Sequence, residues 1–312
     1  MRDDWALRDD WPNRSASRFV RAGGVRWHVQ QLGAGPPLLL IHGTGSATHS
    51  WRDLAPLLAE RFSVIAPDLP GHGFSSAGES GLFRLDGMAA ALGELLAELD
   101  VTPRVALGHS AGAAILIRMA LDGLIAPRAL VSVNGALLPL SGFPRWLFAP
   151  LARWSAGSSW VTHLVARRGA NPAAVERLIG DTGSRLDARG LELYRCLFQQ
   201  PAHVRAALSM MAGWDLQSLA VDLPRLRAPL VLLVAKGDRT IPAAEADRIK
   251  SILPRTRVVL FEEGGHLLHE ERPRAVAEEV FRLATQARLL AGDRQLNSPG
   301  RGLQWVAHPM QS

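Results

Sequence analysis

The chain has 312 residues, of which 47% are hydrophobic and 21% are charged. Apolar content this high excludes wholesale disorder, and the length suits one large core or a core with an insertion. No apolar run approaches the roughly 20 residues of a membrane-spanning helix. The Asp- and Arg-rich N-terminus lacks the apolar stretch of a secretory signal. We therefore expect a cytoplasmic protein.

The net charge is +6, and the basic side chains are mostly arginines scattered along the chain. No nucleic-acid-binding motif accompanies them, so we expect no nucleic-acid partner. Weak attraction to an anionic membrane or an acidic ligand is compatible with this charge. Cys196 is the single cysteine, which excludes an internal disulfide and a thiolate metal cluster.

The first predicted element is a β-hairpin of residues 19–21 and 25–31. Gly23 and Gly24 lie between the two runs and supply the positive φ of a tight turn. Short apolar runs that alternate with helical patterns follow at 38–41, 62–66, 105–107, 130–133, 230–235 and 258–261. Such alternation predicts an α/β fold with a mostly parallel sheet and helices on both faces.

The alternation stops between about residues 137 and 224, where aromatic side chains recur at helical spacing. We interpret residues 137–224 as a helical cap inserted into a core of residues 18–136 and 225–290. Residues 1–17 and 291–312 are expected to be terminal extensions, because they are polar or rich in turn residues.

The motif G-x-S-x-G occurs at Gly108-His109-Ser110-Ala111-Gly112, between a strand-like run and a helical pattern. In this context the turn is sharp and raises the serine hydroxyl above the sheet, and the following helix N-terminus favours developing negative charge. We predict that Ser110 is a nucleophile, with a purely structural elbow serine as the alternative.

A serine nucleophile needs a base, and the base needs an orienting carboxylate. Asp238 follows the run 230–235, and His266 follows the run 258–261 after two glycines. The chain order Ser, Asp, His is that of α/β hydrolases. We therefore expect Ser110, Asp238 and His266 to form a catalytic triad.

An oxyanion hole takes one of its N–H groups from the loop after the first buried strand, where His42-Gly43-Thr44-Gly45 stands. We expect the backbone N–H groups of Thr44 and Ala111 to form it. The candidates for the substrate pocket are His42, Gly43, His109, Trp146, Trp154 and Trp214.

Over roughly residues 18–288 the chain resembles the α/β-hydrolase superfamily, including the run PDLPGHGFS from Pro67. A closer similarity is to the magnesium-chelatase accessory proteins of bacteriochlorophyll biosynthesis. The motifs that carry it are DWPNR from Asp10, HGTGSATHSWRDLAPLLA from His42, GHSAGAAI from Gly108, NGALLPL from Asn134, LDARGLELY from Leu186 and MMAGWDL from Met210. This resemblance implies a role in photosynthetic pigment synthesis, a porphyrin-like ligand and magnesium chelatase as a partner.

Two alternatives to Asp238 as the catalytic acid arise from the sequence. Asp238 is also placed to cap a helix before Pro242. Asn134 follows the fourth strand, where some relatives keep an alternative acid, but an amide cannot stabilise an imidazolium as a carboxylate does. Asp238 is therefore preferred. Structural support through hydrogen bonds is expected from His42, His72 and Asp68.

His269 lies three residues after His266, at a predicted helix start before two glutamates. We expect it at the surface. A metal site of His266, His269 and Glu270 lacks a convincing third ligand, so no metal is expected. No phosphate-binding loop and no dinucleotide fingerprint occur, so no nucleotide cofactor is expected.

The leading hypothesis is a serine hydrolase that cleaves a hydrophobic carboxylic ester, because aromatic residues line the predicted cap. Carbon–carbon bond hydrolysis and perhydrolysis use the same triad and stay open. The alternative function is a non-catalytic accessory protein that binds a porphyrin or magnesium chelatase. Arginines interleaved with Trp146 and Trp154 are typical of cap helices whose apolar face covers the active site, and they also suggest, as an alternative, peripheral membrane contact.

Overall fold

A computed structural model describes residues 6–78, 80–139 and 159–289. Its centre is an eight-stranded sheet in the order β1-β2-β4-β3-β5-β6-β7-β8. β2 runs antiparallel to β1 and β4, and all other neighbours are parallel. This confirms the predicted α/β class. The strands are β1 (Ser17–Ala22), β2 (Val25–Leu32), β3 (Pro37–Ile41), β4 (Ser63–Pro67), β5 (Val105–His109), β6 (Ala129–Val133), β7 (Leu230–Ala235) and β8 (Arg257–Phe261).

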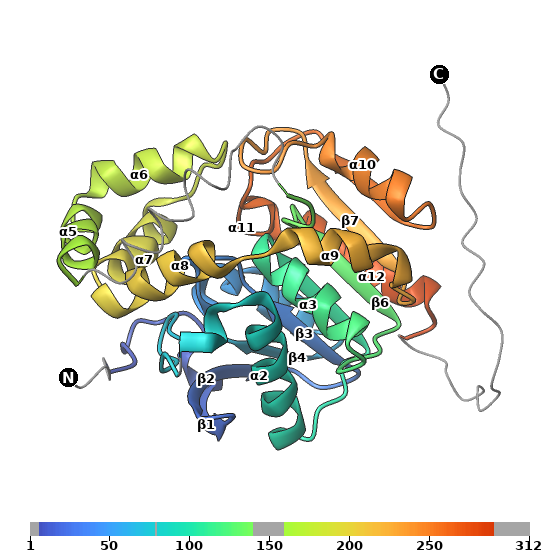
Figure 1. Cartoon of the computed structure of the whole chain (residues 1–312), viewed down its shortest axis with the longest axis horizontal. Coiled ribbons are helices and arrows are strands. Elements are labelled where there is room, and N and C mark those ends of the chain that lie inside the picture. The colour runs from blue at the N-terminus through green and yellow to red at the C-terminus, as the bar shows by residue number, and fades with distance from the viewer. Residues whose placement is uncertain (1–5, 79, 140–158, 290–312) are drawn as a thin grey trace.

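Helices cover both faces of the sheet (Figure 1). Those of the core are α1 (Leu54–Ala59), α2 (Leu85–Glu98), α3 (Ala111–Leu121), α10 (Glu245–Ile252), α11 (Leu268–Glu271) and α12 (Pro273–Gln286). Short 3₁₀ turns are η1 (Arg14–Ala16), η2 (Thr48–Trp51), η3 (Ser80–Phe83) and η4 (Leu223–Arg225). None of the helices within the described ranges combines the length and apolar character that crossing a membrane requires.

The β1–β2 hairpin forms where the two glycines predict it. Gly23 and Gly24 have φ values of 55° and 71°, and Ala22 pairs with Val25 across the turn. This left-handed backbone matches the twist of the two strands, and it suits glycine because a Cβ would be strained there.

Alternating residues of the central strands pack on opposite faces of the sheet. In β3, Leu39 and Ile41 belong to the apolar cluster with α2 and α3, whereas Leu38 and Leu40 belong to the cluster with α1 and α12. All four are fully buried, and each such leucine contributes about 1.5–3 kcal/mol to folding. Apolar packing therefore holds the sheet on both faces, and the loops at the ends of its strands start from well-packed positions.

The chain changes direction across the sheet at β3. From β3 it passes through α1 to β4 on one side, and α2 then carries it back to β5 on the other side. Loops at the carboxyl ends of two such strands diverge, and ligands of open α/β sheets bind between them. Here those loops carry Thr44 and Ser110.

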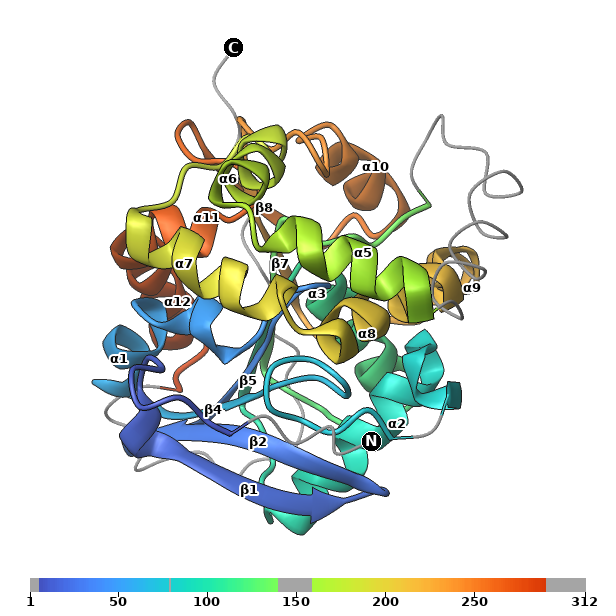
Figure 2. The same cartoon turned by 90° about the vertical axis from the view of Figure 1, so that its left-hand side faces the viewer.

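The interval predicted to form a cap contains α5 (Ser159–Gly169), α6 (Pro172–Asp181), α7 (Ala188–Phe198) and α8 (Pro201–Gly213), hereafter called the cap. These helices lie together beyond one edge of the sheet (Figure 2). Side-chain caps begin two of them, since Asn171 accepts from the N–H of Ala173 and Asp187 from that of Gly190. In the same interval, α9 (Leu216–Asp222) packs on α3 of the core and is held there by the Arg118–Asp222 ion pair.

The N-terminal segment joins the core to the cap. Trp11 is only 2% exposed, its Nε1 donates to Thr48 Oγ1 at 3.1 Å, and its ring packs edge-on against Phe74. Leu193 and Leu197 of α7 complete this apolar cluster. Sequence periodicity did not single out Trp11, because a lone aromatic residue in a polar segment has no pattern.

Candidate active site

Ser110 occupies the turn between β5 and α3. Its φ of 50° and ψ of −118° lie in a region that residues other than glycine rarely adopt, at a cost of about 1–3 kcal/mol. The Ser110 N–H donates to the Val133 carbonyl at 3.0 Å, and the Ser110 carbonyl accepts from the Ala136 N–H at 3.1 Å. Hydrogen bonds to β6 and the following loop thus hold the turn, and Ser110 stays partly exposed.

The flanking glycines make this turn possible. A Cβ on Gly108 would lie 2.5 Å from the Ala113 nitrogen, and one on Gly112 would collide with the Ile41 carbonyl oxygen. The G-x-S-x-G pattern therefore reflects close packing of the first turn of α3 on the ends of β3 and β5.

Asp238 and His266 form a hydrogen-bonded pair at the same edge of the sheet, after β7 and β8. His266 Nδ1 lies 2.8 Å from Asp238 Oδ2. The other carboxylate oxygen accepts from the N–H groups of Thr240 at 2.7 Å and Ile241 at 2.9 Å. Asp238 therefore caps a turn and orients His266 at once. Because Nδ1 donates to the carboxylate, Nε2 is the imidazole nitrogen left to accept a proton.

Asn134 does not contact the imidazole of His266. Its φ is 45°, and its Nδ2 donates to the carbonyls of Gly265 and His266, both at 2.9 Å. Its Oδ1 accepts from the Ala235 N–H at 2.9 Å. The amide thus fastens the loop that carries His266 to the end of β7, a role that the sequence did not suggest.

His109 supports the same loop from below. Its Nε2 donates to the His266 carbonyl at 3.0 Å, so the ring proton sits on Nε2. Its Nδ1 is buried and has no partner within the described residues. Burial lowers the pKa of His109 well below its ordinary value, which keeps the ring neutral.

His42 holds the loop after β3 (residues 42–46), which is hereafter called the oxyanion loop after the role expected of Thr44. Its Nδ1 donates to the Gly43 carbonyl at 2.8 Å, and its Nε2 accepts from the Leu69 N–H at 2.9 Å. The expected supporting role of His42 is confirmed. His72 is likewise buried and donates from Nδ1 to the Pro70 carbonyl.

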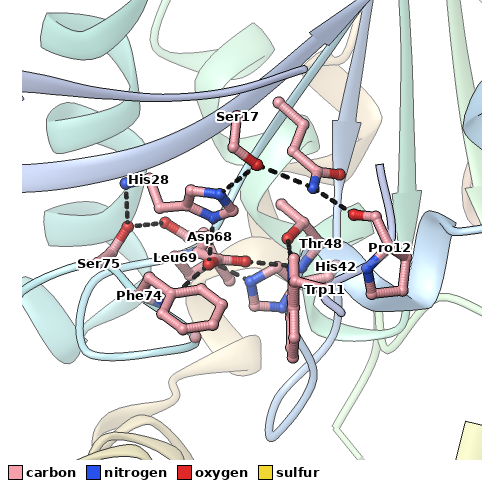
Figure 3. A network of polar contacts seen from close by, with 12 residues as sticks. Trp11, Pro12, Ser17, His28, His42, Thr48, Asp68, Leu69, Phe74 and Ser75 are labelled. Atoms are coloured by element: carbon pink, nitrogen blue, oxygen red, sulfur yellow. Dashed lines mark hydrogen bonds and ion pairs between the residues drawn. The ribbon is translucent and has the colours of Figure 1, made fainter. Parts of the chain in front are cut away.

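Asp68 is the centre of a buried network behind this loop (Figure 3). Its carboxylate accepts from the N–H groups of Thr48 at 2.6 Å and Phe74 at 2.9 Å, and from His28 Nδ1 at 2.7 Å. Burial raises the pKa of Asp68, but His28 and the backbone donor outweigh this effect and lower it. The expected role of Asp68 as a structural acceptor is confirmed.

Two backbone N–H groups border Ser110. Ala111 is the first residue of α3, and the first N–H groups of a helix have no intrahelical acceptor. No acceptor for the Thr44 N–H occurs in the described part of the chain. Gly43 brings the oxyanion loop close, since a Cβ there would lie 3.1 Å from Ser110 Cβ.

The prediction that His269 lies at the surface is wrong. His269 is fully buried, and its Nε2 lies 2.7 Å from Ser50 Oγ. Ser50 Oγ and Tyr194 OH donate to Glu270 Oε1 at 2.6 and 2.7 Å, and Arg52 donates to Oε2 at 2.7 Å. The short helix α11 turns inward under the cap, which a local helix-start pattern does not reveal. Burial raises the pKa of Glu270 to about 7, against the opposing effect of Arg52.

Of the tryptophans expected to line the pocket, Trp146 and Trp154 lie outside the described residues. Trp214 ends α8 and is half-buried, with an indole N–H that has no partner among the described residues. No cluster of three or more His, Cys, Asp or Glu side chains able to hold a metal occurs in the described ranges.

Comparison with known proteins links this fold and site to one family. The model of the "Alpha/beta hydrolase family" matches residues 38–279. The chain is 41% identical over 273 residues to the "Magnesium-chelatase 30 kDa subunit" of Rhodobacter capsulatus, covering 86% of this chain and 94% of that protein.

Two further similarities have lower identity. The chain is 28% identical over 249 residues to the "Pimeloyl-[acyl-carrier protein] methyl ester esterase" of Nitrosomonas europaea, covering 77% of this chain and 92% of that protein. A crystal structure of an alpha/beta hydrolase fold protein from Burkholderia ambifaria superposes with a TM-score of 0.71 at 27% identity, covering 86% of this chain and 97% of the other.

Proposed function

The chain belongs to the alpha/beta hydrolase family, and we propose that it is a serine hydrolase that cleaves a hydrophobic carboxylic ester. The observation that carries this proposal is the 2.8 Å hydrogen bond between His266 and Asp238. It lies at the carboxyl edge of the parallel strands, where Ser110 stands in its strained turn.

In the acylation step, Ser110 Oγ bonds to the acyl carbon while its proton passes to His266 Nε2. Asp238 holds the imidazole orientation and stabilises the positive charge that develops on the ring. The carbonyl oxygen becomes an oxyanion, which the N–H groups of Thr44 and Ala111 bind. The ester C–O bond then breaks, and the alcohol leaves with the proton from His266.

Water completes the reaction. His266 Nε2 takes a proton from a water molecule whose oxygen attacks the acyl-enzyme carbon. The second tetrahedral intermediate collapses, Ser110 Oγ regains the proton from His266, and the carboxylic acid leaves. The same two N–H groups bind the oxyanion in both halves of the reaction.

Two relatives support the class of substrate. One is named as a methyl ester esterase, and the more similar one is named as a subunit of magnesium chelatase. We infer an ester on a hydrophobic, porphyrin-like molecule of bacteriochlorophyll biosynthesis. The aromatic residues of the predicted cap, Trp214 among them, would bind its flat apolar surface.

A non-catalytic function is the second candidate, and the name of the magnesium-chelatase relative favours it. In that case the chain binds a porphyrin or magnesium chelatase, and the Ser110 hydroxyl is dispensable. Pigment formation by a strain that carries Ser110→Ala distinguishes the two, because a binding protein tolerates the change and a hydrolase does not.

Peripheral contact with an anionic membrane is a further part of the proposal. Leu164, Arg167 and Arg168 are exposed on α5 of the cap, a mixture that suits an interfacial surface. Co-sedimentation with anionic liposomes tests it, and equal sedimentation of wild type and a Leu164→Ser, Arg167→Ser variant would contradict it.

The first experiment treats purified wild type and Ser110→Ala with a fluorophosphonate and measures intact mass. We expect one adduct on wild type and none on the variant, because only an activated serine reacts. A folded wild type without an adduct would overturn the hydrolase and favour the accessory protein, for which porphyrin binding is the next assay.

A further inference from the structure

The cap is attached directly to the oxyanion loop. Three successive residues of that loop each receive a side chain from α7 or α8. The contacts are Thr44 Oγ1 to Met210 Sδ at 3.4 Å, Gly45 O to His203 Nε2 at 3.1 Å and Ser46 Oγ to Tyr194 OH at 3.4 Å. A cap that served only to enclose a substrate cavity would not need polar contacts with the oxyanion loop.

His203 is the strongest of these links because both of its ring nitrogens are used. Nδ1 accepts from the Gly73 N–H at 3.1 Å, so the ring proton is on Nε2, which donates to the Gly45 carbonyl. His203 is 1% exposed, and burial lowers its pKa to about 4, so the ring is neutral near pH 7. One side chain of α8 thus joins the loops that follow β3 and β4.

These bonds bear on the direction of the Thr44 N–H. That N–H shares a peptide plane with the Gly43 carbonyl, which accepts from His42 Nδ1 at 2.8 Å and from the Ser46 N–H at 3.2 Å. On the other side of Thr44, Gly45 has a φ of 73° and its carbonyl is held by His203. A core histidine and a cap histidine therefore fix the backbone on either side of Thr44.

We propose that His203 is a positioning residue for hydrolysis, through which helix α8 of the cap holds the oxyanion loop in its catalytic shape. This rests on the proposed function, because it assigns the Thr44 N–H to the oxyanion. Beyond that function, the cap takes part in stabilising the oxyanion because it holds the loop that carries the Thr44 N–H. Displacement of α8 releases the Gly45 carbonyl and lets the Thr44 N–H turn away, so hydrolysis requires a seated cap.

A second connection from the cap supports this assignment. Tyr194 of α7 contacts Ser46 and also donates to Glu270 Oε1 at 2.7 Å. Glu270 lies in α11, four residues after His266. Through α7 the cap is thereby linked both to the oxyanion loop and to the segment that follows the proposed general base.

Two variants at one position separate the two hydrogen bonds of His203. In His203→Gln, the amide nitrogen can occupy the place of Nε2 and donate to the Gly45 carbonyl. In His203→Asn, the shorter side chain can accept from the Gly73 N–H but cannot reach Gly45. The measurements are kcat and KM for p-nitrophenyl butyrate, the rate of fluorophosphonate labelling and the pH profile of kcat/KM.

For His203→Asn we expect kcat and the labelling rate to fall by about 10- to 100-fold with KM within about twofold, because complete loss of an oxyanion donor costs about 10²–10³-fold. His203→Gln should stay within about fivefold of wild type. The shape of the pH profile of kcat/KM should be the same in both variants as in wild type. Equal kcat for the Asn variant and wild type, or a raised KM alone, would overturn the proposal.

The outcomes also separate this inference from the proposed function. A wild type without a Ser110 adduct ends both, whereas a labelled wild type and an equally labelled His203→Asn variant end the positioning role alone. If the Asn variant does not fold, amide hydrogen exchange of wild type replaces it. Phosphonylation of Ser110 should slow exchange in residues 43–46 and in α8 together, and unchanged exchange in α8 would refute the coupling.

Discussion

The molecule contains two groups of serine, histidine and carboxylate whose histidines are only three residues apart. One is the proposed triad of Ser110, His266 and Asp238, in which the His266–Asp238 hydrogen bond is present, and the other consists of Ser50, His269 and Glu270. In the first, Ser110 is partly exposed at the carboxyl ends of the parallel strands. In the second, Ser50 is 2% exposed and His269 is fully buried.

The direction of each hydrogen bond separates the two groups chemically. The Ser50 hydroxyl donates its one hydrogen bond to Glu270, so His269 Nε2 must donate to Ser50 Oγ. Arg52 and Tyr194 donate the other hydrogen bonds that the Glu270 carboxylate accepts. No nitrogen of His269 is therefore available as a base for Ser50. In the other group His266 Nδ1 donates to Asp238, so Nε2 carries no proton and can act as a base. The two groups combine similar residue types, and the exposure of the serine together with the direction of the hydrogen bonds decides which group can react.

The largest effect is expected from a matched pair of serine variants. Ser110→Ala should lower kcat for p-nitrophenyl butyrate by about 10⁴-fold or more, as expected for loss of a nucleophile. Ser50→Ala should leave kcat within about tenfold of wild type. The buried Ser50 hydroxyl takes no part in the proposed reaction, and its hydrogen bond contributes about 1 kcal/mol to stability. Circular dichroism of both variants controls for folding. A loss of the same size in Ser50→Ala would contradict the distinction between the groups.

The carboxylates provide the second test. Asp238→Asn should lower kcat by about 10³–10⁴-fold, since an amide favours the wrong tautomer of the histidine and leaves its charge unstabilised. Glu270→Gln should retain kcat within about tenfold, because Glu270 touches no reacting atom. Steady-state kinetics at pH 8 measure both. A larger loss of kcat in Glu270→Gln than in Asp238→Asn would contradict the assignment of Asp238 as the carboxylate that orients the base.

A smaller effect is expected at Asn134, which holds the loop of His266 but not His269. Asn134→Ala removes two hydrogen bonds to the carbonyls of Gly265 and His266, so kcat should fall by about tenfold. The KM for p-nitrophenyl butyrate should hardly change. If KM rises instead and kcat is retained, Asn134 acts on substrate binding and does not position the base His266.

The smallest effect concerns stability and pH. The folded-state pKa of Glu270 is raised to about 7 by burial. The protonated carboxyl therefore contributes fully to the free energy of unfolding at pH values below the pKa of an unfolded glutamate, and this contribution is lost as pH rises through 7. The free energy of unfolding of wild type should therefore fall by about 1 kcal/mol more than that of Glu270→Gln between pH 6 and 8.5. Urea unfolding at several pH values measures this, and parallel curves would argue against a raised pKa.

Much of the fold followed from local sequence. The apolar runs of β3 to β8 and the glycine pair of the hairpin each act over a few residues, and the structure has them where they were predicted. The order of Ser110, Asp238 and His266 along the chain placed all three at one edge of the sheet. Carboxyl ends of parallel strands must share an edge, so this much needs no knowledge of loop paths.

Contacts between distant loops could not be predicted in the same way. His269 was assigned to the surface because its neighbours look like an exposed helix start, yet α11 packs under the cap against Ser50 and Trp51. His203 carries no motif, and its partners Gly45 and Gly73 are more than 120 residues away, as the separations of 158 and 130 show. Asn134 was considered as an acid, but it binds backbone.

The sequence by itself determined the α/β class, the elbow at Ser110 and the strand ends that carry Asp238 and His266, because periodicity, turn chemistry and strand direction are local properties. Only the tertiary structure decided that Ser110 stays partly exposed while Ser50 is buried, that His269 turns inward, and that His203 of the cap reaches the oxyanion loop. Those outcomes depend on burial and on hydrogen bonds between segments far apart in the chain, and both exist only once the loops and the cap have packed.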